Sequence, residues 1–268
     1  MIFKLGLCQM KGSEDKIRSI ETAEEMVKKA AYMGADIISL PEMFNCPYDN
    51  SNFRMYAENE SGMTVKRLSK LASEEGIYLI GGSIPELDGE NVYNTCFCFD
   101  KNGNIAAKHR KIHLFNIDIE GGIRFMESET LTAGDKMTIF NTEYCDVGIA
   151  ICFDVRFPEL FRRMALEGAN LVVLPAAFNM TTGPAHWDLT MRARALDNQI
   201  YFAACSPARS SDGGYMAYGH SCIVNPWGDF SGKLDANQGV LIGDINLDYL
   251  EKIRSQLPLL SQRKPEVY

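Results

Sequence analysis

The chain has 268 residues, which is enough for one large α/β domain or two small ones and for a full hydrophobic core. Its 35 acidic and 27 basic side chains give a net charge of −8, which argues against binding to nucleic acid or to an anionic membrane. We therefore expect a small-molecule partner, no nucleic acid and no membrane.

The eight cysteines show no spacing typical of a disulfide framework. Residues 1–8 are too soon interrupted by charge for a signal peptide, and no uncharged apolar run approaches the roughly 18 residues of a membrane span. These features predict a cytoplasmic protein with reduced thiols. Cys96 and Cys98 form a lone Cys-x-Cys pair with no second pair at zinc-ligand spacing, so we expect no metal and no cofactor.

The first third of the chain repeats a strand–helix–strand pattern. Periodicity and Gly breaks predict a strand over 2–8, a helix over 13–34, a strand over 36–40, a helix over about 65–76 and a strand over 77–81. Glu42 comes just past the second strand, where open α/β sheets keep their ligand sites. A solvated turn carboxylate is the alternative interpretation, because Glu is rarely fully buried unless it is paired.

A hairpin comes next, over residues 92–110, with the Asn102-Gly103 pair supplying the positive φ values of a tight turn. The hairpin leads to Lys111, the last residue of a basic run that is also typical of a solvated sheet edge. Residues 112–135 are rich in Gly and charge and too irregular for a regular element, and a loop of this length suggests a function. This loop contains Glu127.

A cysteine marks the most distinctive turn of the sequence. Cys152 ends the apolar run 148–152 and precedes Pro158, a residue that is tolerated at the first position of a helix. A strand-to-helix turn of this kind lifts one side chain out of the sheet and aims backbone N–H groups at a ligand, as in a nucleophile elbow. A packed thiol is the alternative, since free cysteine is among the most buried residue types.

The second half resembles the first. Residues 167–178 share Gly, Ala, Leu, Pro and Phe with residues 33–44 at matching positions, and Ala176 stands where the first half has Glu42. The other elements expected here are a helix over 158–168, strands over 170–175, 201–206, 218–224 and 239–244, a helix through 187–196, a helix over 247–256 and an extended tail over 258–268. Two such halves predict an α/β fold in which two mixed sheets pack by their bare faces into a four-layer α-β-β-α sandwich, within one domain over 1–268.

The candidate residues together fit a site for nucleophilic catalysis by a cysteine. A thiol with a pKa near 8.5 is only a few per cent thiolate at pH 7, so attack by Cys152 requires a base, which Glu42 can supply. Lys111 and the backbone N–H of Phe153 can stabilise a tetrahedral oxyanion, a donor role worth roughly 3 kcal/mol per hydrogen bond. Glu127 would orient Lys111.

Three separated segments resemble the signature segments of the nitrilase superfamily of carbon–nitrogen hydrolases. They are residues 40–44, 108–115 and 148–159. The resemblance runs nearly end to end. It implies Glu42 as general base, Lys111 as oxyanion stabiliser, Cys152 as nucleophile and Glu127 as the supporting second glutamate, and it also implies the sandwich fold.

Within the superfamily, residues 178–187, 204–209 and 218–228 look most like those of ω-amidases, which hydrolyse the side-chain amide of α-keto acids. The resemblance thus implies release of ammonia from α-ketoglutaramate or a similar short dicarboxylate monoamide, through a cysteine thioester. Deaminated-glutathione amidases, N-carbamoyl or aliphatic amidases and nitrilases are the alternatives, and an inactive scaffold is the non-enzyme alternative. Relatives form dimers, so we expect a homodimer with two-fold symmetry.

A substrate with a distal carboxylate needs a local cationic or N–H-rich patch in this acidic protein. Arg156, four residues after Cys152, is the leading candidate, unless it pairs with Glu159 or another carboxylate. The other substrate-binding candidates are the possible donors Thr181 and Thr182 and the possible pocket walls Tyr48, Phe115 and Phe178.

Two rival cysteine chemistries differ in their partner residues. A Cys–His hydrolase would take its base from one of the four histidines, His109, His113, His186 and His220, and sequence order does not exclude it. A cysteine phosphatase requires five residues between Cys and Arg. Cys152 and Arg156 enclose three, so that chemistry is excluded.

Overall fold

The computed structural model describes residues 1–120, 124–210 and 214–267. In this part of the chain the strands form two large mixed sheets and one small sheet of two strands. The first large sheet has the order β15-β1-β2-β3-β5-β4, and β6 also pairs with β5. Its strands are β1 (Ile2–Gln9), β2 (Ile37–Ser39), β3 (Tyr78–Ile80), β4 (Ile84–Asp88), β5 (Asn91–Phe99), β6 (Ile105–Arg110) and β15 (Gly239–Asn246).

The second large sheet has the order β14-β13-β12-β11-β10-β9. Its strands are β9 (Thr138–Asn141), β10 (Asp146–Ile149), β11 (Leu171–Pro175), β12 (Tyr201–Cys205), β13 (Cys222–Val224) and β14 (Phe230–Lys233). The small sheet pairs β7 (Asn116–Asp118) with β8 (Arg124–Met126).

The two large sheets share one pairing pattern. A parallel trio, β1-β2-β3 in the first sheet and β10-β11-β12 in the second, is flanked on both sides by antiparallel strands. This agrees with the repeat in the sequence. The two halves of the chain are not fully separate, however. In the second sheet, the antiparallel neighbour of β10 is β9, which comes from the same half of the chain. In the first sheet, the corresponding neighbour of β1 is β15, which comes from the end of the chain.

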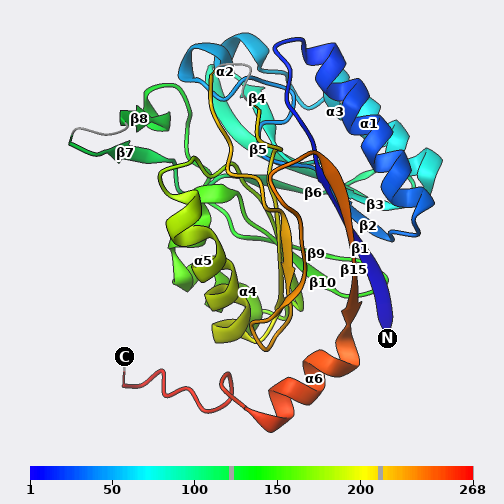
Figure 1. Ribbon diagram of the computed structural model, residues 1–268, viewed down its shortest axis with the longest axis vertical. Coiled ribbons are helices and arrows are strands. Elements are labelled where there is room, and N and C mark those ends of the chain that lie inside the picture. The colour runs from blue at the N-terminus through cyan, green and yellow to red at the C-terminus, as the bar shows by residue number, and fades with distance from the viewer. Residues whose placement is uncertain (121–123, 211–213, 268) are drawn as a thin grey trace.

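Helices α1 (Lys16–Tyr32) and α3 (Met63–Glu75) cover the outer face of the first sheet, and α4 (Pro158–Leu166) and α5 (Gly183–Asn198) cover that of the second. Helices α2 (Asn50–Tyr56) and α6 (Leu247–Gln256) lie toward opposite ends of the sandwich (Figure 1). Figure 1 shows α1 and α3 on one side of the paired sheets and α4 and α5 on the other. One buried cluster joins side chains of both sheets, such as Leu5 and Leu7 of β1 with Val147 and Ile149 of β10. The result is the expected four-layer α-β-β-α sandwich.

Local sequence signals explain where the main elements begin. The Asp15 side chain accepts hydrogen bonds from the N–H groups of Ile17 and Arg18 and so caps α1. Pro158 occupies the first position of α4, as its place after the cysteine turn predicts. β11 is buried along its whole length, which is typical of an inner strand covered on both faces.

Several short elements were not predicted from the sequence. α2, β4 and β14 were not expected, and the irregular segment 112–135 contains β7, β8 and the 3₁₀ helix η1 (Glu127–Glu129). The strand expected over 218–224 is confined to Cys222–Val224. Elements of three to seven residues show too few periods for a pattern to be recognised, and their pairing depends on neighbours far away in the sequence.

The C-terminal helix lies where it was expected, because α6 begins at Leu247 and ends at Gln256. The expected extended tail is not extended throughout: residues 258–267 contain turns, one of them closed by a hydrogen bond from the Gln262 N–H to the Pro258 carbonyl, and residue 268 lies outside the described residues. All eight cysteines are buried and form no disulfide. No helix among the described residues is both long and apolar enough to cross a membrane.

Candidate active site

Four chemistry-bearing side chains from separate elements meet at one edge of the sandwich. Glu42 lies shortly after β2, Lys111 directly after β6, and Cys152 shortly after β10. Glu127 opens η1 in the segment that follows β7 and β8. The structure therefore brings together the four residues that the sequence singled out.

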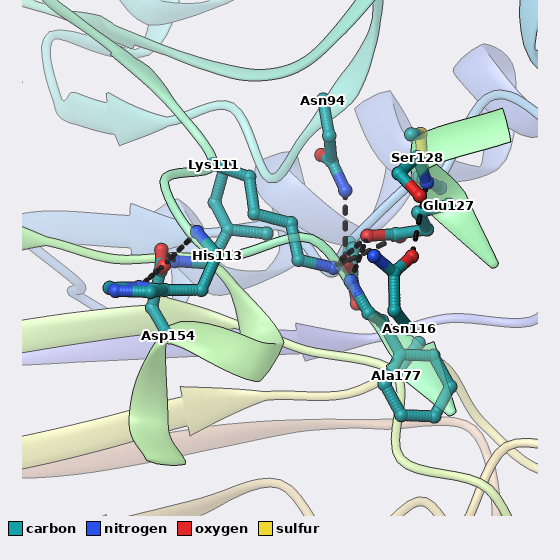
Figure 2. Close-up of polar contacts among 12 residues, drawn as sticks. Asn94, Lys111, His113, Asn116, Glu127, Ser128, Asp154 and Ala177 are labelled. Carbon is teal, nitrogen blue, oxygen red and sulfur yellow. Dashed lines mark hydrogen bonds and ion pairs between the residues drawn. The ribbon is translucent and has the colours of Figure 1, made fainter. Parts of the chain in front are cut away.

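The Lys111 ammonium lies between two carboxylates. Its Nζ donates to Glu42 Oε1 at 2.9 Å and to both oxygens of Glu127, at 3.0 Å to Oε1 and 2.9 Å to Oε2. All three side chains are buried. Figure 2 shows the extended Lys111 side chain reaching Glu127, with Asn94 on the opposite side of the ammonium from Asn116.

Charge balance determines how this cluster is protonated. Burial alone would lower the pKa of Lys111, but the charges of Glu127 and Glu42 more than offset it and raise that pKa. Burial raises the pKa of Glu42, Glu127 raises it further, and Lys111 opposes the rise. Lys111 is therefore a permanent cation, whereas Glu42 is a carboxylate with an increased affinity for a proton.

Neutral donors hold the two carboxylates in place. Asn94 Nδ2 donates to Glu42 Oε1 at 2.9 Å, and the Tyr48 hydroxyl donates to Glu127 Oε1 at 2.7 Å. The Phe115 N–H donates to Glu127 Oε2 at 2.7 Å, and the Glu127 N–H returns a bond to the Phe115 carbonyl. Glu42 Oε2, in contrast, has no such donor within the described residues, so it is the oxygen that can accept a proton from its neighbour Cys152.

Cys152 occupies a strained turn. Its φ is +44°, in the left-handed region that side chains other than Gly rarely adopt, and it opens the 3₁₀ helix η2 (Cys152–Arg156). Burial raises the pKa of the thiol, as does the Glu42 charge, while Lys111 opposes the rise. The thiol is therefore neutral near pH 7 and requires a base in order to react.

Backbone N–H groups surround the thiol. The first hydrogen bond of η2 runs from the Asp154 N–H to the Ile151 carbonyl, so the N–H groups of Cys152 and Phe153 precede the first bond of the turn. The Ala177 N–H, from the segment after β11, contacts the Cys152 sulfur and favours its anionic form. Phe153 directly follows the cysteine in this turn, and its N–H stays the predicted oxyanion donor.

The expected substrate-binding side chains differ in what they contact. The Arg156 guanidinium lies 4.8 Å from the centre of the Phe178 ring and makes no ion pair within the described residues, so the alternative of a pair with Glu159 is wrong. Its charge interacts with Cys152. Phe115 is buried, and its ring packs against Phe153 at 5.3 Å.

The two threonines offer fewer donors than expected. The N–H groups of Thr181 and Thr182 both donate to Asn179 Oδ1, at 3.0 Å and 2.9 Å, and the Thr182 hydroxyl donates to the same oxygen. The backbone donors are therefore already satisfied within this turn. Asn179 could have been recognised in advance, because an Asn side chain commonly accepts a hydrogen bond from a backbone N–H two residues further along the chain.

None of the four histidines is placed to act as the base for the Cys152 thiol in this structure. His109 and His113 both contact Asp154, His220 contacts the Leu234 carbonyl, and His186 is exposed on α5. Glu42 is the only carboxylate or imidazole that interacts directly with the thiol among the described residues. The geometry therefore favours a Cys–Glu pair over a Cys–His pair.

Among the described residues, no group of three or more His, Cys, Asp or Glu side chains is arranged to hold a metal ion.

A family model for carbon–nitrogen hydrolases matches residues 4–255. The chain belongs to this family. It is 51% identical to the omega-amidase NIT2 of Xenopus tropicalis and 48% identical to that of Homo sapiens, over 99% of this chain and 96% of each relative. Nit3 of Saccharomyces cerevisiae, a member of branch 10 of the nitrilase superfamily, is similar with a TM-score of 0.91 at 38% identity, covering 98% of this chain and 97% of that one.

A more distant carbon–nitrogen hydrolase is the amidase from Nesterenkonia sp. AN1, with a TM-score of 0.79 at 26% identity, covering 96% of this chain and 98% of that one. One structure of that amidase shows the result of Michael addition of acrylamide at its active site cysteine. These similarities confirm the nitrilase fold that the sequence predicted.

Sequence reasoning missed three residues of this carbon–nitrogen hydrolase site. Asn94 holds Glu42, and Tyr215 packs its ring 4.6 Å from that of Tyr48 while its hydroxyl donates to the Ala177 carbonyl. Asp154 accepts four hydrogen bonds beside Cys152. Only Asp154 carried a signal, because it lies two residues after the cysteine in a signature segment.

Replacement of Lys111 by Met tests the charge balance of the cluster. The change leaves Glu42 and Glu127 buried without their cation, so we expect the free energy of unfolding at pH 7 to fall by about 3–5 kcal/mol. The loss should shrink as the pH falls, because burial, no longer opposed by Lys111, raises the pKa of Glu42 in the folded state, so that Glu42 takes up a proton on folding. Urea unfolding at pH 7 and pH 5.5 measures both effects.

The exposed Lys70 provides the control for this substitution. Lys70→Met should change the stability by less than about 0.5 kcal/mol at either pH. A Lys111→Met loss below about 1 kcal/mol, or one that grows at low pH, would contradict the charge assignment.

Proposed function

We propose that this carbon–nitrogen hydrolase is an ω-amidase, which releases ammonia from α-ketoglutaramate or a similar short dicarboxylate monoamide. The observation that carries the proposal is the buried cluster in which Glu42 touches both the Lys111 ammonium and the Cys152 thiol. The identity of about half the residues to omega-amidases of vertebrates supports the choice of substrate class.

The reaction begins with activation of the thiol. Glu42 takes the Cys152 proton at Oε2, and the sulfur attacks the amide carbon to form a C–S bond. The amide oxygen becomes an oxyanion, which the Lys111 ammonium and the Phe153 N–H stabilise. Because the two carboxylates keep Lys111 protonated, it acts here as a cation and not as a base.

The second stage releases ammonia and then hydrolyses the thioester. Glu42 gives its proton to the amide nitrogen, the C–N bond breaks, and ammonia leaves a thioester on Cys152. Glu42 then deprotonates a water, which attacks the thioester carbon, and the thiolate recovers the proton as the acid product leaves. Glu127 does not exchange protons in this scheme, and it keeps the Lys111 ammonium in position.

The alternatives share this chemistry and differ in substrate. A deaminated-glutathione amidase, an N-carbamoyl or aliphatic amidase and a nitrilase would use the same three residues. An inactive scaffold would release no ammonia from any of these compounds. Comparison of α-ketoglutaramate and succinamate with deaminated glutathione, an aliphatic nitrile and an N-carbamoyl amino acid distinguishes them, and faster turnover of one of the last three would replace the ω-amidase assignment.

Substitutions of the nucleophile and the base test the chemistry directly. Cys152→Ala should abolish ammonia release, with at least a 100-fold loss of kcat, and leave the urea midpoint nearly unchanged because the core lies in the strands below. Glu42→Gln should be far more damaging than His113→Ala or His186→Ala. A loss below 100-fold for Cys152→Ala, or the reverse order of Glu42→Gln and the histidine variants, would contradict the scheme.

We propose that Arg156 binds the distal carboxylate of the substrate. The guanidinium is half-buried, has no acidic partner among the described residues and interacts with the Cys152 side chain. In this proposal Phe178, which lies beside the Arg156 guanidinium, and Phe115 form walls of the pocket, together with Tyr48, whose hydroxyl lies 3.3 Å from Glu42 Oε1. The Thr181 hydroxyl is the proposed remaining donor of the two threonines.

Arg156→Ala should raise the KM for α-ketoglutaramate or succinamate by about 10-fold or more, the size expected for loss of a charge-assisted hydrogen bond. The KM of an uncharged amide of equal length should change much less. Arg163→Ala, which removes an exposed arginine from α4, is the matched control and should leave both values unchanged. An equal change in the KM of charged and uncharged amides in Arg156→Ala would show that this arginine does not bind the substrate carboxylate.

We also propose that the chain forms one domain and that two copies pair as a homodimer through α4 and α5. Large apolar side chains are exposed there, namely Leu166, Leu189, Leu196 and Trp227. The Arg192 side chain donates to the Gly228 carbonyl, which ties the turn that carries Trp227 to α5. An apolar patch of this kind is typical of a protein–protein interface.

Sedimentation at micromolar concentration should therefore give the mass of a dimer. Leu189→Asp should shift the protein toward a monomer, because it places a charge in the apolar patch. Tyr32→Asp is the control, since Tyr32 is exposed on α1, on the other outer face of the sandwich. A wild-type monomer, or an equal effect of the two substitutions, would contradict the proposal.

A further inference from the structure

Asp154 has a place in the site that none of the proposed steps uses. It is fully buried in η2, two residues after Cys152, and its carboxylate accepts four hydrogen bonds. The donors are the N–H groups of Ile151 and His113 and the imidazoles of His113 and His109. One of these donors belongs to the cysteine turn, and the other three belong to the segment that carries Lys111.

The first connection is to the cysteine turn itself. Asp154 Oδ2 accepts the Ile151 N–H at 2.9 Å, while the Asp154 N–H donates to the Ile151 carbonyl at 3.0 Å. These two bonds close a ring around Cys152 and Phe153. A residue with a φ of +44° persists only where its surroundings enforce it, and this ring encloses that residue.

The second connection is to the segment that carries Lys111. Asp154 Oδ1 accepts the His113 N–H at 2.9 Å and the His113 Nδ1 at 2.8 Å, and Oδ2 lies 3.4 Å from His109 Nε2. His109 and His113 lie two residues before and two residues after Lys111. Figure 2 shows Asp154 and His113 in contact at the start of the Lys111 side chain, on the side away from Glu127.

We propose that Asp154 is a positioning residue, whose carboxylate fixes the Cys152 sulfur relative to the Lys111 ammonium. The inference rests on the proposed role of Cys152 as nucleophile. Asp154 itself touches neither the thiol proton nor the substrate in the scheme above. It acts by joining the turn that carries the nucleophile to the segment that carries the cation.

Only an ionised carboxylate can make all four contacts. Burial alone would raise the pKa of Asp154, but the contacts with His109 and His113 more than offset it and hold that pKa well below its usual range. An asparagine has one acceptor oxygen, so its NH₂ would face either the Ile151 N–H or the His113 N–H. The turn would then move, and displacement of reacting groups by about 1 Å can reduce a rate by about 100-fold.

Kinetics of Asp154→Asn provide the first test. We expect kcat per active site for the best amide of the substrate panel to fall by about 30-fold or more, with KM within about 3-fold of wild type. Asp36→Asn is the matched control. Asp36 also accepts a backbone N–H, that of Lys4, and a side-chain hydroxyl, that of Tyr144, but it lies at the other end of β2 from Glu42. This control should lower the urea midpoint and leave kcat unchanged.

The rate of alkylation by iodoacetamide, measured for each cysteine by mass spectrometry, provides the second test. It distinguishes a loss of Cys152 positioning from a general loosening of the fold. In Asp154→Asn the labelling of Cys152 should slow by at least 10-fold, because Glu42 no longer meets the thiol, and the buried Cys205 should stay unlabelled. Faster labelling of Cys205 with an unchanged kcat per active site would show that Asp154 serves stability alone, which would overturn the inference.

His113→Ala extends the test if Asp154→Asn does not fold. This variant keeps both main-chain N–H bonds to Asp154 and removes only the His113 imidazole, so kcat should fall by about 3- to 10-fold with KM unchanged. An unchanged kcat would overturn the inference. Failure of the wild-type protein to hydrolyse any amide of the panel would instead overturn the proposed function, so the two failures are distinguishable.

Discussion

The site depends on one buried cation held between two buried carboxylates. Lys111 is fully buried, so its charge must be balanced by Glu42 and Glu127, and removal of one partner would leave an uncompensated charge in the interior. This requirement explains why three separate segments converge here. It also leaves Glu42 with one oxygen on the ammonium and the other without a hydrogen-bond donor among the described residues, so that this second oxygen is free to accept a proton.

The rest of the fold supplies rigid positions for these groups. Glu42 and Cys152 follow β2 and β10, whose residues are packed in the core, while Lys111 follows β6, a mostly exposed strand that is paired with the buried β5. The strained φ of Cys152 fits this arrangement, because a sharp turn at a strand end exposes the sulfur to neighbours on both sides. The strands that precede Glu42 and Cys152 therefore both stabilise the fold and position the reacting side chains.

The sequence predicted the sandwich and the four central residues because both have strong local signals. Long periodic helices, the Asn102-Gly103 turn and the repeat of residues 33–44 in 167–178 each point to the same architecture. Contacts between distant segments have no such signal. Nothing near Asn94 in the chain shows that its amide meets Glu42, and the donors of Thr181 and Thr182 could not be known to be occupied without the geometry of Asn179.

The central claim is that Cys152 forms a covalent acyl intermediate with Glu42 as its base. Rapid acid quenching of the enzyme during turnover of succinamate, followed by peptide mass spectrometry, tests it most directly. The account predicts that the mass of the succinyl group, as a hydroxylamine-sensitive thioester, is found on the peptide that contains Cys152 and is absent from Cys152→Ser and Glu42→Gln at the same quench time. An acyl group on another residue, or an equal amount in Glu42→Gln, would contradict it.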